Sequence, residues 1–214
     1  MMKIVYLDVD GILLDFNSYI ISLYEEKYNY KFPKGYLPGS WGMTDCIPGK
    51  EIAHWKDMVP EDWPSLLKSL PGARDFIEKL RDIEGVHIIL VTALNQKKQI
   101  YRIKNLRELD IYYDEIFFTG YKQSKANLIE ELNDRFIDRY SVEKIIFVDD
   151  KLYNCVDVLN KFEFYPKCKL FKVYSIDMPY NDKEIENSIL KANNKFKVLP
   201  NYNELFETIL KDLN

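Results

Sequence analysis

The stretch IVYLDVDGILLDF, residues 4–16, leads from an apolar run to two acids, Asp8 and Asp10, and then to Gly11. Because the residues before Asp8 are almost all apolar, they predict a strand buried on both faces, as in a parallel sheet. Two like charges this close repel, and their burial costs several kcal/mol each unless a positive charge compensates. An Asp-Gly pair also fits an ordinary turn. The acids therefore indicate either a simple turn or a site for a divalent cation and a phosphate.

Composition limits the class of protein. The chain has 214 residues, 47% of them hydrophobic and 30% charged, which is typical of a folded globular protein. The net charge of −4 and the lack of a long basic run argue against binding to a nucleic-acid polymer. No apolar stretch reaches membrane-spanning length, and the N-terminal run is too short for a signal peptide. We expect a cytoplasmic protein without a membrane partner.

The cysteines and histidines do not form the patterns of a disulfide-rich protein or a zinc site. Three widely spaced cysteines without a Cys-x-x-Cys motif argue against a disulfide framework or a thiolate zinc site: Cys46, Cys155 and Cys168. The two histidines, His54 and His87, are far apart in the chain, so a histidine-rich metal site is not expected.

Strand-like and helix-like segments alternate along the rest of the chain. Four further apolar runs predict buried strands, at 86–92, 115–119, 144–150 and 169–176. Between them lie amphipathic helices; in the one at 99–109 we expect a buried face made of Ile100, Ile103, Leu106 and Leu109. This alternation predicts an α/β protein with a doubly wound, Rossmann-like parallel sheet of about five strands. The part after residue 177 is polar and then helical.

The interval 16–70 interrupts this alternation. It contains no convincing strand, and about 55 residues are far more than an ordinary connection needs. We interpret it as a small, mainly helical cap domain inserted into a core domain made of residues 1–15 and 71–214. The alternative is an elaborated first crossover that packs on the sheet.

Residues able to bind a metal ion or a phosphate gather at the expected carboxyl ends of the strands. These ends form one edge of an open parallel sheet, where ligands bind. Taken singly, a strand-terminal aspartate is often a helix cap, and a lysine is usually a surface residue. Together they predict one site, with two lysines as candidates for its cation: Asp8, Asp10, Thr92, Asp149, Asp150, Asn154, and Lys125 or Lys122.

The order of these motifs resembles that of the haloacid-dehalogenase-like phosphohydrolase superfamily. The resemblance covers residues 4–154 and rests on strand–Asp8-x-Asp10-Gly11, strand–Thr92, a lysine at a helix start, and strand–Asp149-Asp150-x-x-x-Asn154. The position of the interval 16–70 matches that family's cap. The resemblance implies the Rossmann-like fold and a phosphatase that acts on small phosphomonoesters.

The resemblance also implies roles for the acids. Asp8 would be the nucleophile that forms an aspartyl-phosphate, and Asp10 would be the general acid and then the general base. Mg²⁺ would be bound by Asp8, the Asp10 carbonyl oxygen and Asp150, with Asp149 in a supporting or water-mediated contact. Relatives without the second acid include the dehalogenases, so Asp10 favours phosphomonoester hydrolysis over carbon–halogen chemistry.

The remaining residues of the motifs would bind phosphate. Thr92 would donate a hydrogen bond to it, and Lys125 would neutralise it. Lys125 is preferred to Lys122 because it begins the following helix. Asn154 would hold a metal-bound water or Lys125.

The substrate is less constrained. The segments DGILLDF (10–16) and MPYN (178–181) are similar to segments of the 5′(3′)-deoxyribonucleotidase family, which suggests a nucleoside 5′-monophosphate. Gly11, Phe16 and Trp41 are the candidate substrate contacts, with Trp55 and Trp63 as further rings on which a base could stack; the alternative is that these rings form the core of the cap. A phosphomutase, a sugar-phosphate phosphatase and a non-catalytic phospho-ligand-binding protein stay open, as does the oligomeric state.

Overall fold

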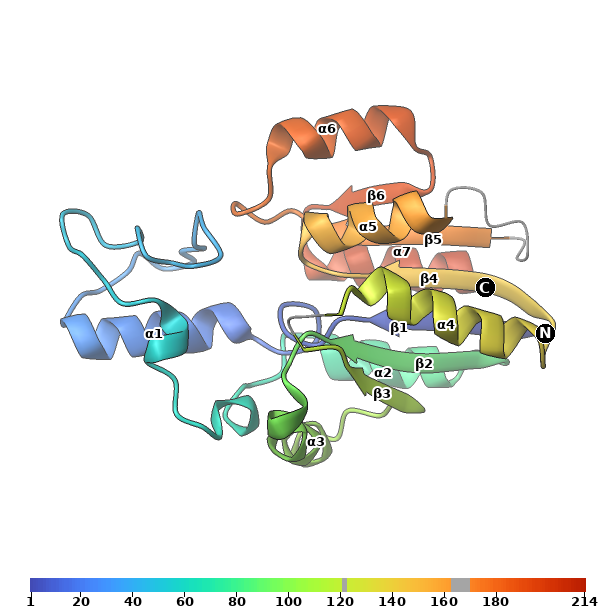
Figure 1. The fold of residues 1–214 in the computed structure, drawn as a ribbon, viewed down its shortest axis with the longest axis horizontal. Coiled ribbons are helices and arrows are strands. Elements are labelled where there is room, and N and C mark those ends of the chain that lie inside the picture. The colour runs from blue at the N-terminus through green and yellow to red at the C-terminus, as the bar shows by residue number, and fades with distance from the viewer. Residues whose placement is uncertain (121–122, 163–169) are drawn as a thin grey trace.

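The computed structural model describes residues 1–120, 123–162 and 170–214, and its centre is a parallel sheet (Figure 1). Within these residues the sheet has six strands in the order β3-β2-β1-β4-β5-β6. The strands are β1 (Met2–Leu7), β2 (Val86–Thr92), β3 (Glu115–Phe118), β4 (Val142–Val148), β5 (Leu170–Ile176) and β6 (Phe196–Leu199). The order reverses direction between β1 and β4, and a crevice at such a point is where open α/β sheets bind ligands.

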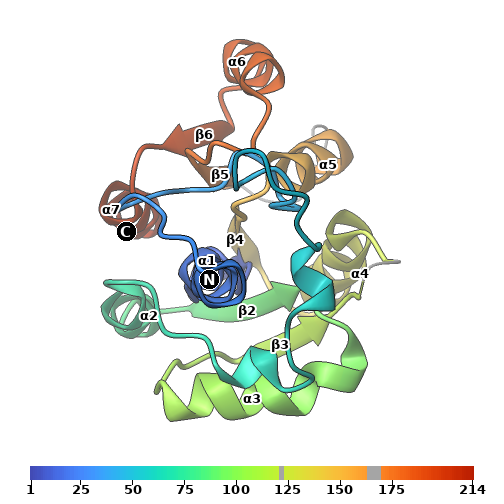
Figure 2. The same ribbon diagram turned by 90° about the vertical axis from the view of Figure 1, so that its left-hand side faces the viewer.

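Helices cover both faces of the sheet. Figure 2 shows α2 (Ala73–Arg81) and α7 (Tyr202–Leu213) on one side, and α4 (Lys125–Ile137) and α5 (Leu152–Phe162) on the other. Because β1 is covered on both sides, its alternate residues enter two different cores: Val5 and Leu7 the first, Ile4 and Tyr6 the second. This two-sided burial explains the unbroken apolar run. The predicted doubly wound α/β fold is confirmed.

The C-terminal part holds two elements that the sequence pattern did not predict. Helix α6 (Lys183–Ala192) is followed by β6, which pairs with β5 at the edge of the sheet. In strand β6 the exposed Lys197 interrupts a short apolar run, so the segment lacks the continuous apolar pattern of the predicted strands. The sheet therefore has one strand more than the expected five.

The interval 16–70 leaves the sheet and returns to it at one point. Backbone hydrogen bonds pair Asp15 N–H with Lys68 O at 2.8 Å and Leu70 N–H with Leu13 O at 2.9 Å. Between these points lie α1 (Phe16–Tyr28) and the short helices η1 (Trp55–Asp57) and η2 (Trp63–Ser65), whereas residues 29–54 form neither helix nor strand. In Figure 1 this interval lies to the left of the sheet, beyond the carboxyl ends of the strands. Its division from the core as a separate domain stays a prediction.

Helix α3 (Gln99–Glu108), preceded by the short helix η3 (Gln96–Lys98), is rotated from the expected orientation. Its buried residues are Arg102, Asn105 and Leu106, whereas Ile100 is 68% and Ile103 40% exposed. The predicted burial of these two isoleucines is wrong. The polar interactions of Arg102 and Asn105, described below, account for the rotation.

Two further findings concern the whole chain. Among the residues that the structure describes, no helix combines the length and the apolar character that a membrane span needs. Cys46 and Cys155 are free thiols, and Cys168 lies outside the described residues.

Candidate active site

Adjacent strands bring the acids together. Strands β1 and β4 are parallel neighbours with Leu7 opposite Val148, so the residues that follow them, Asp8 and Asp149, leave the sheet side by side. Asp8, Asp149 and Asp150 are all buried, and each offers a carboxylate oxygen that lies within 4.8 Å of the others. The expected meeting of these three acids at one edge is what the structure contains.

Lys125 supplies a positive charge at the centre of this group. It is the first residue of α4, which begins after the N-cap Ser124, and its side chain is buried. Its Nζ lies 2.8 Å from Asp8 Oδ1 and 2.7 Å from Asp149 Oδ2. Burial alone lowers the pKa of Lys125, but the charges of Asp149 and Asp8 raise it above its usual value, so the ammonium stays charged. Lys122, the alternative, lies outside the described residues.

The contacts of Asp149 suit a supporting position. Besides Lys125, both of its oxygens accept from Asn154 Nδ2 at 3.0 Å, and Oδ1 accepts from the Lys151 backbone N–H at 2.9 Å. These donors occupy the carboxylate and hold Lys125 in place. Asn154 therefore contacts the acid that holds the lysine, not the lysine itself.

Asp150, unlike Asp149, keeps one carboxylate oxygen without a hydrogen-bond donor. Its Oδ2 accepts from the Tyr180 hydroxyl and its backbone oxygen from Asn181 Nδ2 at 2.8 Å, but its buried Oδ1 has no hydrogen-bond partner. Burial and the nearby charge of Asp149 raise the pKa of Asp150 to about 7. Burial likewise raises the pKa of Asp8 well above its usual range. Three buried acids with one lysine in direct contact, and one carboxylate oxygen unpaired, fit the binding of a divalent cation by oxygen ligands.

Gly11 allows the first loop to approach these acids. Its φ of +87° is in the left-handed region, and a Cβ at this position would lie 2.5 Å from Asp150 Oδ2. The Tyr202 hydroxyl fixes the same turn by donating to Gly11 O at 2.9 Å. Close packing against Asp150 therefore requires a glycine here, whether or not Gly11 also contacts substrate.

Asp10 points to a different partner. Its Oδ1 accepts from the Nη2 of Arg102, a side chain with no exposed surface, whereas the Asp10 side chain is 16% exposed. The two acids of the first motif are thus separated electrostatically, since Asp8 pairs with a lysine and Asp10 with an arginine. Because each carboxylate has its own cation, the two acids can lie close together at the end of one strand.

A small cavity of about 60 Å³ adjoins these groups. It is lined by Asp8, Asp10, Phe16, Trp41, Trp55, Trp63, Thr92, Ala93, Leu94, Lys125, Lys151 and Asn154. The Thr92 Oγ1 accepts from the Leu94 N–H at 3.2 Å, so its own proton is free to donate into the cavity. The volume suits a few water molecules and is far below the roughly 300 Å³ of a pocket for a larger ligand.

The predicted aromatic contacts form one cluster over this cavity. Phe16 stacks on Trp41 at 5.2 Å between ring centroids and meets Trp55 and Trp63 edge-on at 5.0 and 5.6 Å. Phe16 covers one face of the Trp41 ring, and Lys151 Nζ lies over the ring, 3.3 Å from its centroid. A stacked base would therefore have to displace Lys151.

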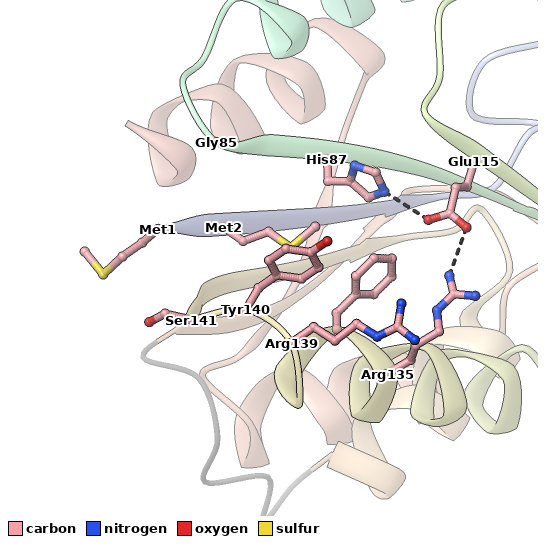
Figure 3. A pocket seen from close by; sticks show the side chains of 10 residues that line it. Met1, Met2, Gly85, His87, Glu115, Arg135, Arg139, Tyr140 and Ser141 are labelled. Atoms are coloured by element: carbon pink, nitrogen blue, oxygen red, sulfur yellow. Dashed lines mark hydrogen bonds and ion pairs between the residues drawn. The ribbon is translucent and has the colours of Figure 1, made fainter.

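A larger cavity, of about 770 Å³, lies elsewhere (Figure 3). It is lined by residues at the start of β1, of β2 and of β3 and by the end of α4, among them His87, Glu115 and Arg135. None of the predicted site residues that the structure describes lines it. Within it, Glu115 lies 3.1 Å from His87 Nε2 and 2.9 Å from Arg135 Nη2.

Sequence reasoning missed four residues that contact the site. Tyr180 and Asn181 follow β5 at the same sheet edge, so a survey of that strand's end would have found them. Lys151 stands next to the two acids of the last motif and could have been noticed from this position alone. Arg102 gave no signal, because an arginine in an amphipathic helix normally lies on the exposed face.

Comparison with known proteins finds similarity only at the level of structure. No family model matches the sequence, and no curated protein matches it significantly. A haloacid-dehalogenase-like hydrolase from Streptococcus pneumoniae superposes with a TM-score of 0.59 at 11% identity, covering 97% of this chain and 98% of its own. A Thermotoga maritima protein assigned as a β-phosphoglucomutase gives 0.61 at 20% identity, covering 100% of both chains. A predicted phosphoglycolate phosphatase from Haemophilus somnus gives 0.57 at 16%, covering 100% and 98%.

Proposed function

With the fold of the haloacid-dehalogenase-like hydrolases as the premise, we propose that the protein hydrolyses small phosphomonoesters with Mg²⁺ through an aspartyl-phosphate at Asp8. One observation carries the proposal: Lys125 lies between Asp8 and Asp149, and the cavity that Asp8 and Lys125 line is also lined by Asp10 and Thr92. This arrangement offers a nucleophile, a proton donor and positive charge for a phosphoryl group.

In the first step a carboxylate oxygen of Asp8 attacks phosphorus, and the bond from phosphorus to the ester oxygen breaks. Asp10 gives its proton to that oxygen, so the product leaves as an alcohol. Lys125 balances the negative charge on the phosphoryl oxygens, and the Thr92 hydroxyl donates to one of them.

In the second step a water molecule attacks phosphorus on the side away from Asp8. Asp10, now ionised, takes the water's proton, and the bond between phosphorus and Asp8 breaks to release inorganic phosphate. Both steps use the same carboxyl group of Asp10 in its two protonation states.

Mg²⁺ would be held by the carboxylates of Asp8 and Asp150 and the Asp10 carbonyl oxygen, and it would neutralise the phosphate and the acids. Asp149 would take part through its hold on Lys125. The unpaired Asp150 Oδ1 supports this choice of ligands.

Turnover of 4-nitrophenyl phosphate tests the proposal and separates it from a non-catalytic phospho-ligand-binding protein. We expect hydrolysis that requires Mg²⁺ and stops with EDTA. Binding of inorganic phosphate without turnover, under conditions where Mg²⁺ binds, would contradict it. The presence of Asp10 favours phosphomonoester hydrolysis over carbon–halogen chemistry. A phosphomutase would transfer the phosphoryl group back to its substrate, so it would release little inorganic phosphate.

The stabilising effect of Mg²⁺ is expected to grow with pH. Because the pKa of Asp150 is raised to about 7 in the fold, the folded protein without metal favours the protonated acid. That contribution to stability is present below about pH 4 and is lost as pH rises through about 7. Mg²⁺ binds the ionised form, so its increase of the thermal midpoint should be small near pH 5.5 and several degrees near pH 8.

Asp150→Asn is the matched variant for this measurement, since it keeps the shape of the side chain but not the charge. It should lose most of the Mg²⁺ effect at every pH. A midpoint shift that is equal at both pH values in the unaltered protein would contradict the assignment of Asp150.

The substrate we favour within this class is a nucleoside 5′-monophosphate, tested beside sugar phosphates in one panel. Because the cavity of about 60 Å³ admits little more than the phosphoryl group, the rest of the substrate must contact the rim, where Trp41 and Lys151 lie. This placement makes Trp41 the residue most able to select the leaving group.

Trp41→Leu is therefore expected to change the ranking of substrates in the panel, by about tenfold between the best and the next substrate. Activity on 4-nitrophenyl phosphate should fall much less. Phe76→Leu is the control: Phe76 is buried against Phe206 and does not line the cavity, so its loss should cost about 1–3 kcal/mol of stability and leave the ranking unchanged. An unchanged ranking in Trp41→Leu would mean that this ring only packs.

A further inference from the structure

Helix α3 inverts the usual hydrophobic pattern close to the candidate active site. It buries Arg102 and Asn105 while Ile100 and Ile103 are exposed. Removing a guanidinium from water costs several kcal/mol, and a well-packed apolar side chain in its place is often as stable or more so. Burial of a charged side chain where an apolar one would be at least as stable indicates that Arg102 has a function.

Arg102 donates hydrogen bonds to two side chains, Asp10 and Asn105. Its Nη2 donates to Asp10 Oδ1, and its Nη1 donates to Asn105 Oδ1 at 3.3 Å. The guanidinium carbon lies 5.7 Å from the Trp63 ring centroid, and Nε has no hydrogen-bond partner. Asp10 is thus the one charged group among these contacts, and it compensates the buried cation.

Asn105 continues the chain of contacts into the inserted interval. Its Nδ2 donates to Ser65 O at 3.1 Å and to Leu67 O at 2.9 Å. A continuous set of hydrogen bonds therefore runs from the end of η2 through Asn105 and Arg102 to Asp10. The position of the Asp10 carboxylate depends on how this part of the interval 16–70 sits on α3.

We propose that Arg102 is a positioning residue that holds Asp10 for proton transfer and ties its orientation to residues 65–67. The inference rests on the proposed role of Asp10 as general acid. Arg102 has no exposed surface and does not line the cavity, so it acts through Asp10 and not on substrate. The contact engages only Oδ1, and Asp10 itself lines the cavity where the substrate would bind.

A positioning role makes a specific prediction about leaving groups. An alkoxide is a strong base and needs a proton as it departs, whereas 4-nitrophenolate is a weak base and departs without one. Loss of Arg102 should therefore slow the first step with 4-nitrobenzyl phosphate and affect 4-nitrophenyl phosphate much less. The two esters carry the same ring, and kcat/KM reports the step that releases the alcohol or phenol.

The experiment measures kcat/KM for both esters with Mg²⁺ in Arg102→Lys and Arg102→Met. Arg102→Lys keeps the positive charge and carries the test if Arg102→Met fails to fold. We expect the ratio of benzyl to phenyl ester to fall at least about tenfold in Arg102→Lys, and further in Arg102→Met if it folds. Arg107→Met, an exposed change on the same helix, should leave the ratio unchanged.

A double-mutant cycle shows whether Arg102 acts through Asp10. In an Asp10→Asn background, adding Arg102→Lys should change neither ester's kcat/KM by more than about twofold. Equal losses on both esters in Arg102→Lys, or a full further loss in the Asp10→Asn background, would overturn the inference while leaving the proposed function in place. Absence of Mg²⁺-dependent turnover in the unaltered protein would instead contradict the proposed function, and this inference with it.

Discussion

Asp8→Asn is expected to lower kcat for 4-nitrophenyl phosphate by a factor of about 1,000 or more, because an amide cannot attack phosphorus as a carboxylate does. The fold should survive the change. Lys125 keeps its 2.7 Å contact with Asp149, and burial already raises the pKa of Asp8, so its ionised form is costly in the folded state. The thermal midpoint without metal should be unchanged or higher.

Rate and thermal midpoint are to be measured on one preparation, beside Asp138→Asn as an exposed control. The control should match the unaltered protein in both quantities. A folded Asp8→Asn protein that keeps more than about a tenth of the activity would rule out Asp8 as the nucleophile.

Lys125→Met is expected to lower both stability and activity. The change removes the cation that lies within 2.8 Å of both Asp8 and Asp149, so these two buried acids lose their ion-pair partner. Removing one partner of a buried ion pair costs about 3–5 kcal/mol. Urea unfolding at about pH 7.5 should show that loss, with part of it recovered when Mg²⁺ is added or when the pH is lowered and the acids take up protons.

Lys161→Met is the matched control for this loss of charge. Lys161 Nζ lies 2.9 Å from Glu130 Oε2, but the two side chains are 29% and 45% exposed. An exposed pair of this kind contributes less than about 1 kcal/mol. Similar stability losses in the two variants would mean that the buried lysine contributes little to the cluster.

The acids of the site could be predicted from sequence because the strands that carry them are central. Strands β1 and β4 are covered on both faces, so they produce unbroken apolar runs, and the acids at their ends stand out. The parallel topology then requires Asp8 and Asp149 to be neighbours. Strand β6, in which the exposed Lys197 interrupts a short apolar run, gives no such contrast, and it was not predicted.

Arg102 shows where pattern reasoning fails. Periodicity places apolar residues inside, which predicts Ile100 and Ile103 on the buried face of α3. The observed helix turns Arg102 inward because Asp10, on a distant part of the chain, supplies the charge that compensates it. A contact that joins residues so far apart in sequence leaves no trace in the local pattern.

Tyr180 and Asn181 illustrate an intermediate case. The segment MPYN was noticed for its likeness to a nucleotidase family, but the structure gives it a physical role at Asp150. Its position after β5, at the edge that holds the acids, was sufficient to predict proximity. The hydroxyl and amide contacts themselves depend on loop geometry that the sequence pattern does not fix.

Detection of the covalent intermediate tests the central claim most directly. Asp10→Asn protein is mixed with 4-nitrophenyl phosphate and Mg²⁺, quenched in acid, and reduced with borohydride, which converts an aspartyl-phosphate to homoserine. Because Asp10 is needed to activate water in the second step, the intermediate should accumulate in this variant, and peptide mass mapping should find homoserine at position 8. Turnover by the unaltered protein with no modification at Asp8, or with modification at another acid, would contradict the account.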